Sequence, residues 1–342
     1  ICVFKAPTGS GKTIMIADFL QQLASEELSQ KYTFIWISGN NLHKQSKEKL
    51  EKYLEASRYT FSYLDEIQDS EFKENEIVFV NWHSLVKQDK KTGEWTNIFM
   101  QDNEQERNLP TFVKNTKSEN KEIILIVDES HYHYWSNQSQ DLIQNVINPK
   151  LTIEVSATPS IVPSIEDVTG GNAGYVSVKF EEVVEQEMIK KEIVINKEID
   201  DLLKNNLSAD EAVIDASISK QKELKGLYKK EKSNINPLVL IQLPSASATA
   251  SNLDMDKLSF VEKYLKEKHN ISIENGKLAI WLSERKDNKE FVEEGDSKVE
   301  VMIFKQAIAL GWDCPRAQIL VMFREIGSLT FEIQTVGRIL RM

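Results

Sequence analysis

The stretch ICVFKAPTGSGKT (residues 1–13) decides the fold class of this 342-residue chain. Its apolar start predicts a strand, the loop from Ala6 to Thr13 follows, and the apolar side chains of residues 14–23 predict a helix. A strand, a glycine-rich loop ending in Gly-Lys-Thr and a helix are typical of a phosphate-binding loop. Ala6 stands where the strict pattern has glycine, and we expect it to close the strand without touching phosphate.

Each residue type in the loop has a chemical reason. Gly9 and Gly11 let backbone N–H groups turn toward phosphate oxygens at the positive end of the helix. Lys12 is expected to reach the β- and γ-phosphates, and Thr13 to offer its hydroxyl to Mg²⁺. A plain glycine turn would leave Gly-Lys-Thr unexplained. We therefore predict a nucleotide site formed by Ala6, Pro7, Thr8, Gly9, Ser10, Gly11, Lys12 and Thr13.

The bulk properties restrict the class of protein. The length and the 41% of hydrophobic residues predict two domains, each with its own core. The net charge of -11 argues against a protein that coats nucleic acid indiscriminately, although a local basic groove stays open. Cys2 and Cys314 are too few and too far apart for a disulfide framework or a cysteine-based zinc site. Without a long apolar run or a signal-like lead, we expect a cytoplasmic protein and no membrane partner.

The first half alternates strands and helices. Continuous apolar runs predict buried strands over residues 33–37, 77–80, 123–127 and 152–155, and residues 42–53 predict a helix. Segment 87–120 is polar and irregular, and it is interpreted as a surface excursion or as partly disordered. This alternation indicates a doubly wound α/β domain.

A charged segment separates this series from a second one. Residues 181–232 are rich in Glu and Lys, and Ser208 with Glu211 forms a capping-box pattern ahead of a charged helix. Strands are predicted again over residues 238–243, 278–282, 301–304 and 319–323. We therefore predict two α/β domains with parallel sheets flanked by helices, at 1–182 and 235–342, joined by a helical connector at 183–234. A chain that begins within a strand is expected to be a fragment, and the second domain to be incomplete at its end.

Paired carboxylates follow the strand that ends at Val127. Asp128 is expected to hold Mg²⁺, mostly through water, and Glu129 to orient and deprotonate the water that attacks ATP. Acids that cap a helix after a turn are the alternative. His131 and His133 lack a cysteine or a third spaced ligand, so they make a poor zinc site.

The sequence Asp128-Glu129-Ser130-His131 resembles the DExH element of superfamily 2 helicases and translocases, which implies two tandem RecA-like ATPase domains. Ser156-Ala157-Thr158 is similar to the motif with which that family couples the state of ATP to its grip on nucleic acid; a plain Ser/Thr turn is the alternative. The resemblance also implies phosphate-backbone contacts or coupling roles for Gln45, Asn81, Trp82 and His131. Core packing is an equal alternative for Trp82, and packing is an alternative for His131.

Two further segments match motifs of the same family. Residues 305–315 look like motif V, which implies nucleotide contacts for Gly311 and Asp313. Residues 334–341 resemble motif VI, which implies catalytic roles for Gln334, Arg338 and Arg341, with both arginines directed at the γ-phosphate. Two solvated arginines on a terminal helix are the alternative.

Together, Asn-Trp after the third strand, Gly-Trp-Asp-x-Pro and Gly-Arg-Ile-Leu-Arg-Met resemble the Res subunit of type III restriction enzymes. The resemblance implies a bacterial, phage-encoded or plasmid-encoded motor that uses ATP and Mg²⁺ to move on double-stranded DNA, with a modification (methyltransferase) subunit as partner. Res proteins carry their nuclease site beyond motif VI, so we assign no cleavage chemistry to these residues. Type I restriction motors, stand-alone phage or plasmid motors, DExH RNA helicases and a non-motor nucleotide switch stay open.

Overall fold

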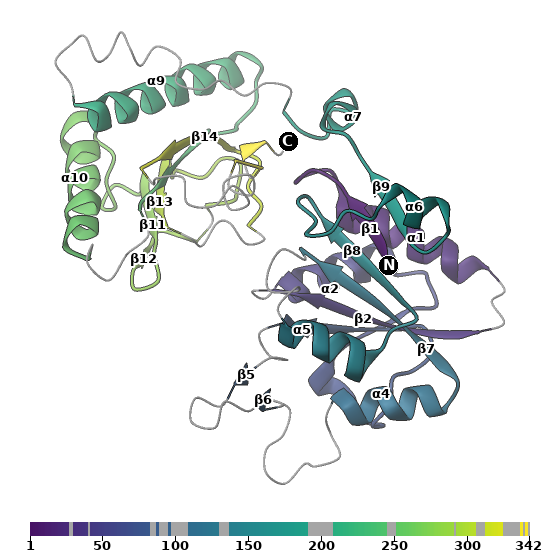
Figure 1. Cartoon of the computed structure of the whole chain (residues 1–342). Coiled ribbons are helices and arrows are strands. Elements are labelled where there is room, and N and C mark those ends of the chain that lie inside the picture. Colours follow the sequence, from purple (N-terminus) through teal and green to yellow (C-terminus); the bar gives the residue numbers. More distant parts are fainter. Residues whose placement is uncertain are drawn as a thin grey trace. The chain divides into compact units, whose positions relative to one another are not determined.

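The protein is described by a computed structural model that covers residues 1–26, 30–39, 42–82, 87–88, 95–96, 109–129, 137–190, 208–244, 251–290, 292–305, 312–323, 336–337 and 339–340. The chain forms two compact units, Ile1–Glu182 and Val183–Met342, each with its own sheet (Figure 1). None of the described helices combines the length and the apolar character that crossing a membrane requires.

The first unit is built on a seven-stranded sheet in which every neighbouring pair is parallel. The strands lie in the order β3 (Thr60–Tyr63), β4 (Glu76–Asn81), β2 (Lys31–Ser38), β7 (Lys121–Asp128), β8 (Leu151–Ser156), β1 (Cys2–Lys5) and β9 (Gly174–Ser177). The predicted strands of the first half are confirmed. The edge strands β3 and β9 were not predicted, because their side chains are only partly buried and their sequences lack an apolar run.

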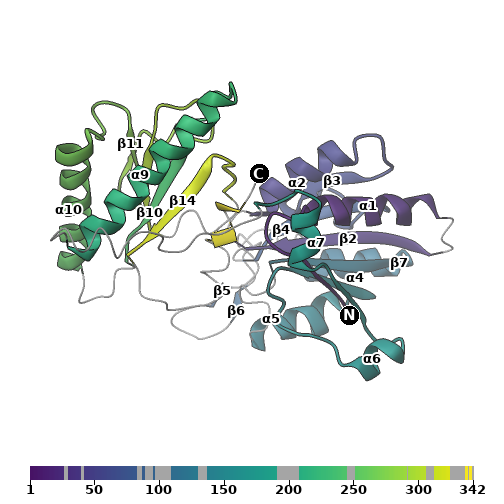
Figure 2. The ribbon, with the colours of Figure 1, turned by 90° about the horizontal axis from the view of Figure 1, so that it is seen from above.

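Alternate residues of each central strand enter different cores. In β2, Phe34 and Trp36 pack with α1 (Lys12–Ser25) and α2 (Leu42–Tyr53), whereas Ile35 and Ile37 pack with α4 (Leu109–Ser118) and the π-helical turn η2 (Leu142–Ile147). Figure 2 shows α1 and α2 on one face of the sheet and α4 on the other. Burial on both faces explains the continuous apolar runs of these strands.

The prediction of an irregular surface excursion at 87–120 is wrong at its end. Leu109, Phe112 and Val113 of α4 are at most 3% exposed and belong to the core. Their helical spacing extends over little more than one turn and is surrounded by polar residues, so the sequence signal is weak. Earlier in the segment, β5 (Lys87–Gln88) pairs antiparallel with β6 (Trp95–Thr96). The remaining short elements of the described first unit and its end are η1 (Leu64–Glu66), α5 (Asn137–Asp141), α6 (Ile165–Thr169) and α7 (Phe180–Glu185).

The second unit holds a five-stranded sheet. Its order is β12 (Lys286–Asp287), β11 (Leu278–Trp281), β13 (Val301–Phe304), β10 (Leu238–Gln242) and β14 (Ala317–Met322), and all pairs except β11 with β12 are parallel. The predicted strands of the second half are therefore confirmed, and so is the α/β class with RecA-like parallel sheets.

Helices α9 (Ala209–Lys230) and α10 (Ser251–His269) pack on one face of this second sheet, and the other face packs against Trp312 and Cys314. The capping box of α9 is confirmed, because Ser208 Oγ accepts from the Glu211 N–H and the Glu211 carboxylate accepts from the Ser208 N–H. This helix lies within the predicted connector and buries Ile214 and Ile218 in the core of the second sheet.

Candidate active site

The residues predicted to carry chemistry in the first unit gather at one edge of its sheet. Ser38 at the end of β2 lies beside Asn81 of β4 and Asp128 of β7. Farther along the same edge, Ser156 of β8 pairs with Lys5, directly before the loop. Because parallel strands end on the same side, four motifs that are far apart in sequence meet at this edge.

The loop adopts the backbone shape that its glycines permit. Gly9 and Gly11 have φ angles of 87° and 80°, in the left-handed region where a Cβ atom is strained. Ser10 is fully buried, and both its N–H (3.2 Å) and its hydroxyl (2.7 Å) donate to the Pro7 carbonyl. The loop is thus closed by its own hydrogen bonds, and its curvature requires the two glycines.

The N-terminus of α1 has the properties of an anion site. Among the described residues no side chain caps it, and its first turn carries no acid. The Thr8 hydroxyl, on the loop before it, is buried without a hydrogen-bond partner in the described part of the chain. Free N–H groups at a helix start attract anions, and an orphaned buried hydroxyl costs free energy unless a ligand satisfies it. Both observations fit a phosphate group in the loop.

Lys12 joins the loop to the acidic pair. Its Nζ lies 3.7 Å from Glu129 Oε1, and both side chains are largely buried, with exposed fractions of 11% and 16%. The same ammonium donates long hydrogen bonds to the carbonyls of Ala6 (3.5 Å) and Pro7 (3.4 Å). These contacts place the Lys12 ammonium and the Glu129 carboxylate next to each other beside the loop.

Glu129 takes an uncommon backbone conformation. Its φ angle is 54°, which non-glycine residues seldom adopt, and its N–H donates to the Val155 carbonyl at 2.9 Å. The turn directly after β7 therefore holds the glutamate next to the end of β8. A strained residue at a sheet edge is typical of a functional site.

Asp128 is held in an environment that disfavours its charge. Burial, followed by the adjacent Glu129 charge, raises the pKa of Asp128 to about 7, against the opposing effects of Lys12 and of a hydrogen bond from Ser46. Ser46 Oγ lies 3.2 Å from Asp128 Oδ2. A divalent cation at this position would favour the carboxylate form.

The donor set fits Mg²⁺ bound together with a phosphorylated ligand. In the described part of the chain no group of three or more His, Cys, Asp or Glu residues could hold a metal by itself. Mg²⁺ is commonly bound by one or two protein oxygens plus phosphate oxygens, and Asp128 and Thr13 supply a carboxylate and a hydroxyl near the loop.

The Ser-Ala-Thr segment is joined to the loop by the backbone. The Ala6 N–H donates to the Ser156 carbonyl at 3.1 Å, and the Thr158 N–H donates to Ser156 Oγ at 3.1 Å. Ser156 is fully buried. A Ser/Thr turn is therefore present, and it begins at the residue that is bonded to the loop.

The other predicted contact residues of the first unit lie in different environments. Gln45 is exposed on α2, Asn81 is half-buried at the end of β4, and Trp82 is 4% exposed in the core that contains α4. The burial of Trp82 favours the packing alternative.

In the second unit, Asp313 is exposed between the buried side chains of Trp312 and Cys314. Five predicted site residues lie outside the described residues: His131, Gly311, Gln334, Arg338 and Arg341.

The sequence did not predict two residues that hold these segments in place, Ser46 in the first unit and Arg316 in the second. Ser46 follows Leu42 and precedes Leu50 at helical spacing on the buried side of α2, so a polar residue in an apolar stripe was its only signal.

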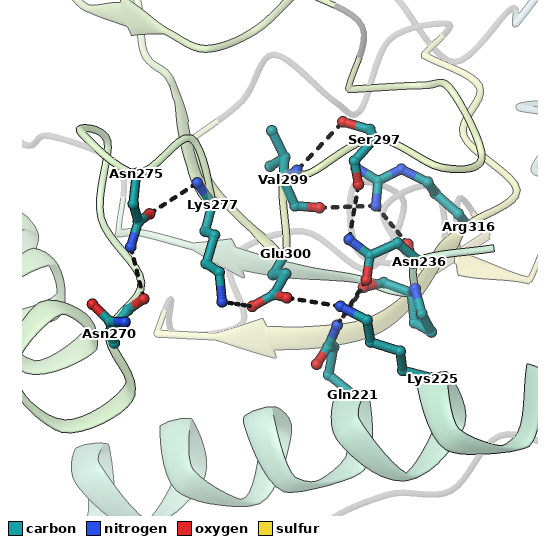
Figure 3. Close-up of polar contacts among 11 residues, drawn as sticks. Gln221, Lys225, Asn236, Asn270, Asn275, Lys277, Ser297, Val299, Glu300 and Arg316 are labelled. Carbon is teal, nitrogen blue, oxygen red and sulfur yellow. Dashed lines mark hydrogen bonds and ion pairs between the residues drawn. The ribbon is translucent and has the colours of Figure 1, made fainter. Parts of the chain in front are cut away.

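Arg316, the residue after Pro315, is 2% exposed. It donates from Nε to Val292 O (2.7 Å) and from one terminal nitrogen to Asn236 O (2.6 Å) and Val299 O (3.0 Å), as Figure 3 shows in part. These bonds fix the end of the Gly-Trp-Asp-Cys-Pro segment on the second sheet. Nothing in the local sequence distinguishes such an arginine from a solvated one.

Comparisons with known proteins identify a family for the first part of the chain. Residues 1–161 match the family model described as "Type III restriction enzyme, res subunit", so the predicted resemblance is confirmed for this part of the chain. A search of curated proteins found no match.

Solved structures share the fold at low sequence identity. The ATP-dependent type ISP restriction-modification enzyme LlaBIII bound to DNA matches with a TM-score of 0.55 and 13% identity, over 99% of this chain and 25% of that chain. A variant of S. cerevisiae Dbp5 bound to Gle1 and IP6 matches with a TM-score of 0.50 and 15% identity, over 98% of this chain and 74% of that chain. A fragment of a putative HsdR subunit of a type I restriction enzyme from Vibrio vulnificus matches with a TM-score of 0.49 and 14% identity, over 100% of this chain and 57% of that chain.

Proposed function

We propose that this chain, whose first 161 residues match the Res family, is an ATP-hydrolysing motor that moves on double-stranded DNA as part of a type III restriction enzyme. The observation that carries the proposal is the 3.7 Å contact of Lys12 with Glu129, next to the buried Asp128, at the mouth of a glycine-rich loop. A loop for phosphate, a carboxylate for Mg²⁺ and a carboxylate for water are the parts that ATP hydrolysis needs.

In the proposed mechanism each residue has a separate task. The N–H groups of the loop and Lys12 hold the β- and γ-phosphates, for which Lys12 leaves the two long carbonyl contacts that it makes in the free protein. Thr13 and Asp128 would hold Mg²⁺, which would neutralise charge on the phosphates. Glu129 orients the attacking water and accepts its proton. Arg338, Arg341 and Gln334, with nucleotide contacts from Gly311 and Asp313, are proposed to complete the site.

The grip on DNA is proposed to follow the nucleotide state. Ser156 and Thr158 are candidates for coupling because the Ser156 carbonyl is bonded to the first residue of the loop. Gln45, Asn81 and His131 are proposed to contact the DNA backbone or to transmit its binding. Contacts to phosphates carry no sequence information, so a modification subunit is the proposed partner that reads the site. The division into domains at 1–182, 183–234 and 235–342 stays part of this proposal.

ATP hydrolysis by the purified chain tests this function. We expect linear duplex DNA to stimulate the release of phosphate, and the stimulation to weaken as salt rises from 50 to 200 mM, since phosphate contacts release counterions (about tenfold or more for several contacts). Lys12→Ala, which removes the phosphate-binding ammonium, serves as the control for contaminating ATPases and should show no turnover. ATP hydrolysis that is stimulated by RNA but not by duplex DNA would indicate an RNA helicase and not a motor on DNA. ATP hydrolysis that no nucleic acid stimulates would favour a nucleotide switch.

A further inference from the structure

Lys190 connects two motif segments of the second unit. Its half-buried ammonium donates to the carbonyls of Pro315 (3.4 Å) and Ala317 (3.2 Å), which lie at the exit of the Gly-Trp-Asp segment. It also donates to the carbonyl of Ile339 at 2.5 Å. The Lys190 N–H adds a fourth bond, to the carbonyl of Leu340 at 2.7 Å. One residue thus holds the end of motif V and the segment of motif VI together.

The acceptor at Ile339 is the kind of group that attracts a cation. Val336, Gly337 and Ile339 are helical and Leu340 is a turn residue, so the Ile339 carbonyl lies at the end of this helical segment. Carbonyls in the last turn of a helix have no intrahelical partner and carry the negative end of the helix dipole. The Lys190 ammonium therefore caps this end.

Apolar packing holds the same segment from a second side. Ile339 packs against the core that contains Trp312 and Cys314, and Leu340 is 7% exposed. Ile189, the neighbour of Lys190, is 2% exposed. The backbone at 339–340 is thus fixed both by the ammonium and by the core.

Burying the Lys190 ammonium costs free energy, which indicates that its charge has a role. Burial lowers the pKa of Lys190 to about 8, with a smaller opposing effect of Cys314. In the part of the chain that the structure describes, this half-buried ammonium has no carboxylate partner, and such a charge stabilises the fold less than an apolar side chain of similar length would, unless its hydrogen bonds are needed. The ammonium bonds hold the carbonyls of Pro315, Ala317 and Ile339 in a defined position.

We propose that Lys190 is a positioning residue for the arginines of motif VI: it sets the backbone at Ile339 and Leu340, the residues between Arg338 and Arg341 in sequence, against the end of motif V. This inference rests on the proposed ATPase function. It assigns Lys190 no contact with nucleotide; the lysine acts through the segment that carries the two arginines. An error of about 1 Å in placing a catalytic group costs on the order of 100-fold in rate.

The test compares Lys190→Met and Lys190→Gln with Lys222→Met in the full chain. The methionine removes all the ammonium bonds, the glutamine keeps a shorter donor, and Lys222 is an exposed lysine of α9 that serves as the matched control. We expect kcat for DNA-stimulated ATP hydrolysis to fall about 10- to 100-fold in Lys190→Met and less in Lys190→Gln, with KM for ATP within about twofold of wild type. Lys222→Met should match wild type. Unchanged kcat in folded Lys190→Met, or a loss of ATP affinity as large as the loss of kcat, would overturn the inference.

Hydrogen exchange gives a readout that does not depend on activity. The amides of residues 336–342 and of Lys190 should exchange faster in Lys190→Met than in wild type or Lys222→Met, because the segment loses its cap. Equal exchange in all three proteins would overturn the positioning role even if no ATPase activity were found. A wild-type chain without ATPase activity, but with the expected change in exchange, would instead count against the proposed function alone. If Lys190→Met does not fold, Lys190→Gln decides both measurements.

Discussion

Ser46 Oγ lies 3.2 Å from Asp128 Oδ2 and donates to it a hydrogen bond that crosses from helix α2 to the end of strand β7. Ser46 is 5% exposed, and the bond opposes the burial that raises the pKa of Asp128. Ser46 is not part of any predicted motif, but Gln45, its neighbour in sequence, is exposed on the same helix. Helix α2 thus joins a candidate contact for nucleic acid to the carboxylate that is proposed to hold Mg²⁺.

Ser46→Ala should raise the Mg²⁺ concentration needed for half-maximal ATP hydrolysis by about tenfold, because a hydrogen bond to a charged group contributes about 1.5–3 kcal/mol. The alanine leaves Asp128 with a stronger preference for its proton. Titration of the ATPase rate with MgCl₂ measures the effect. Ser25→Ala, at the exposed end of α1, is the control and should leave the titration unchanged; an unchanged curve for Ser46→Ala would show that the bond does not tune the site.

The free protein should lose stability as pH rises through 7, and Asp128 should account for it. Its pKa is raised from 3.8 to about 7 in the folded state, so the folded state binds more protons between these values and the stabilising contribution of the protonated form is lost as pH increases. Urea unfolding between pH 5.5 and 8.5, without Mg²⁺ or nucleotide, measures this change. Asp128→Asn carries no titrating group there and should show a flatter dependence. Parallel curves for both proteins would contradict the environment described for Asp128.

Arg316→Met should destabilise the second unit by about 2–4 kcal/mol, because three buried carbonyls lose their donor. Arg285, which is 40% exposed and pairs with Glu262 and Asp287, provides the matched control. We expect Arg285→Met to change the free energy of unfolding by about 1 kcal/mol or less. Denaturant unfolding followed by circular dichroism compares the two, and equal effects would mean that the buried contacts of Arg316 do not anchor its segment.

The sequence predicted those parts of the candidate site whose residues are neighbours along the chain. The loop from Ala6 to Thr13 and the pair Asp128-Glu129 are contiguous, so residue type and order were enough to predict them and the strands that carry them. Ser46, Lys190 and Arg316 could not be predicted in the same way. Each acts through atoms distant in sequence, up to 149 residues away for Lys190 and Ile339, and such contacts follow from tertiary packing. Helix α4 was not predicted for a related reason: its apolar stripe is short, and its helical structure depends on packing into the core.

The most direct measurement of the central claim compares nucleotide binding and phosphate release in wild type and Glu129→Gln. The glutamine keeps the size of the side chain but cannot accept the proton of water, while Asp128 and Lys12 remain. We expect ATP·Mg²⁺ to bind with an affinity within a few-fold of wild type and phosphate release in single turnovers to slow by about 10²- to 10⁴-fold, the range of a general base. Release at the wild-type rate, or loss of ATP binding, would contradict the assignment of Glu129 as the base and of this sheet edge as the centre of hydrolysis.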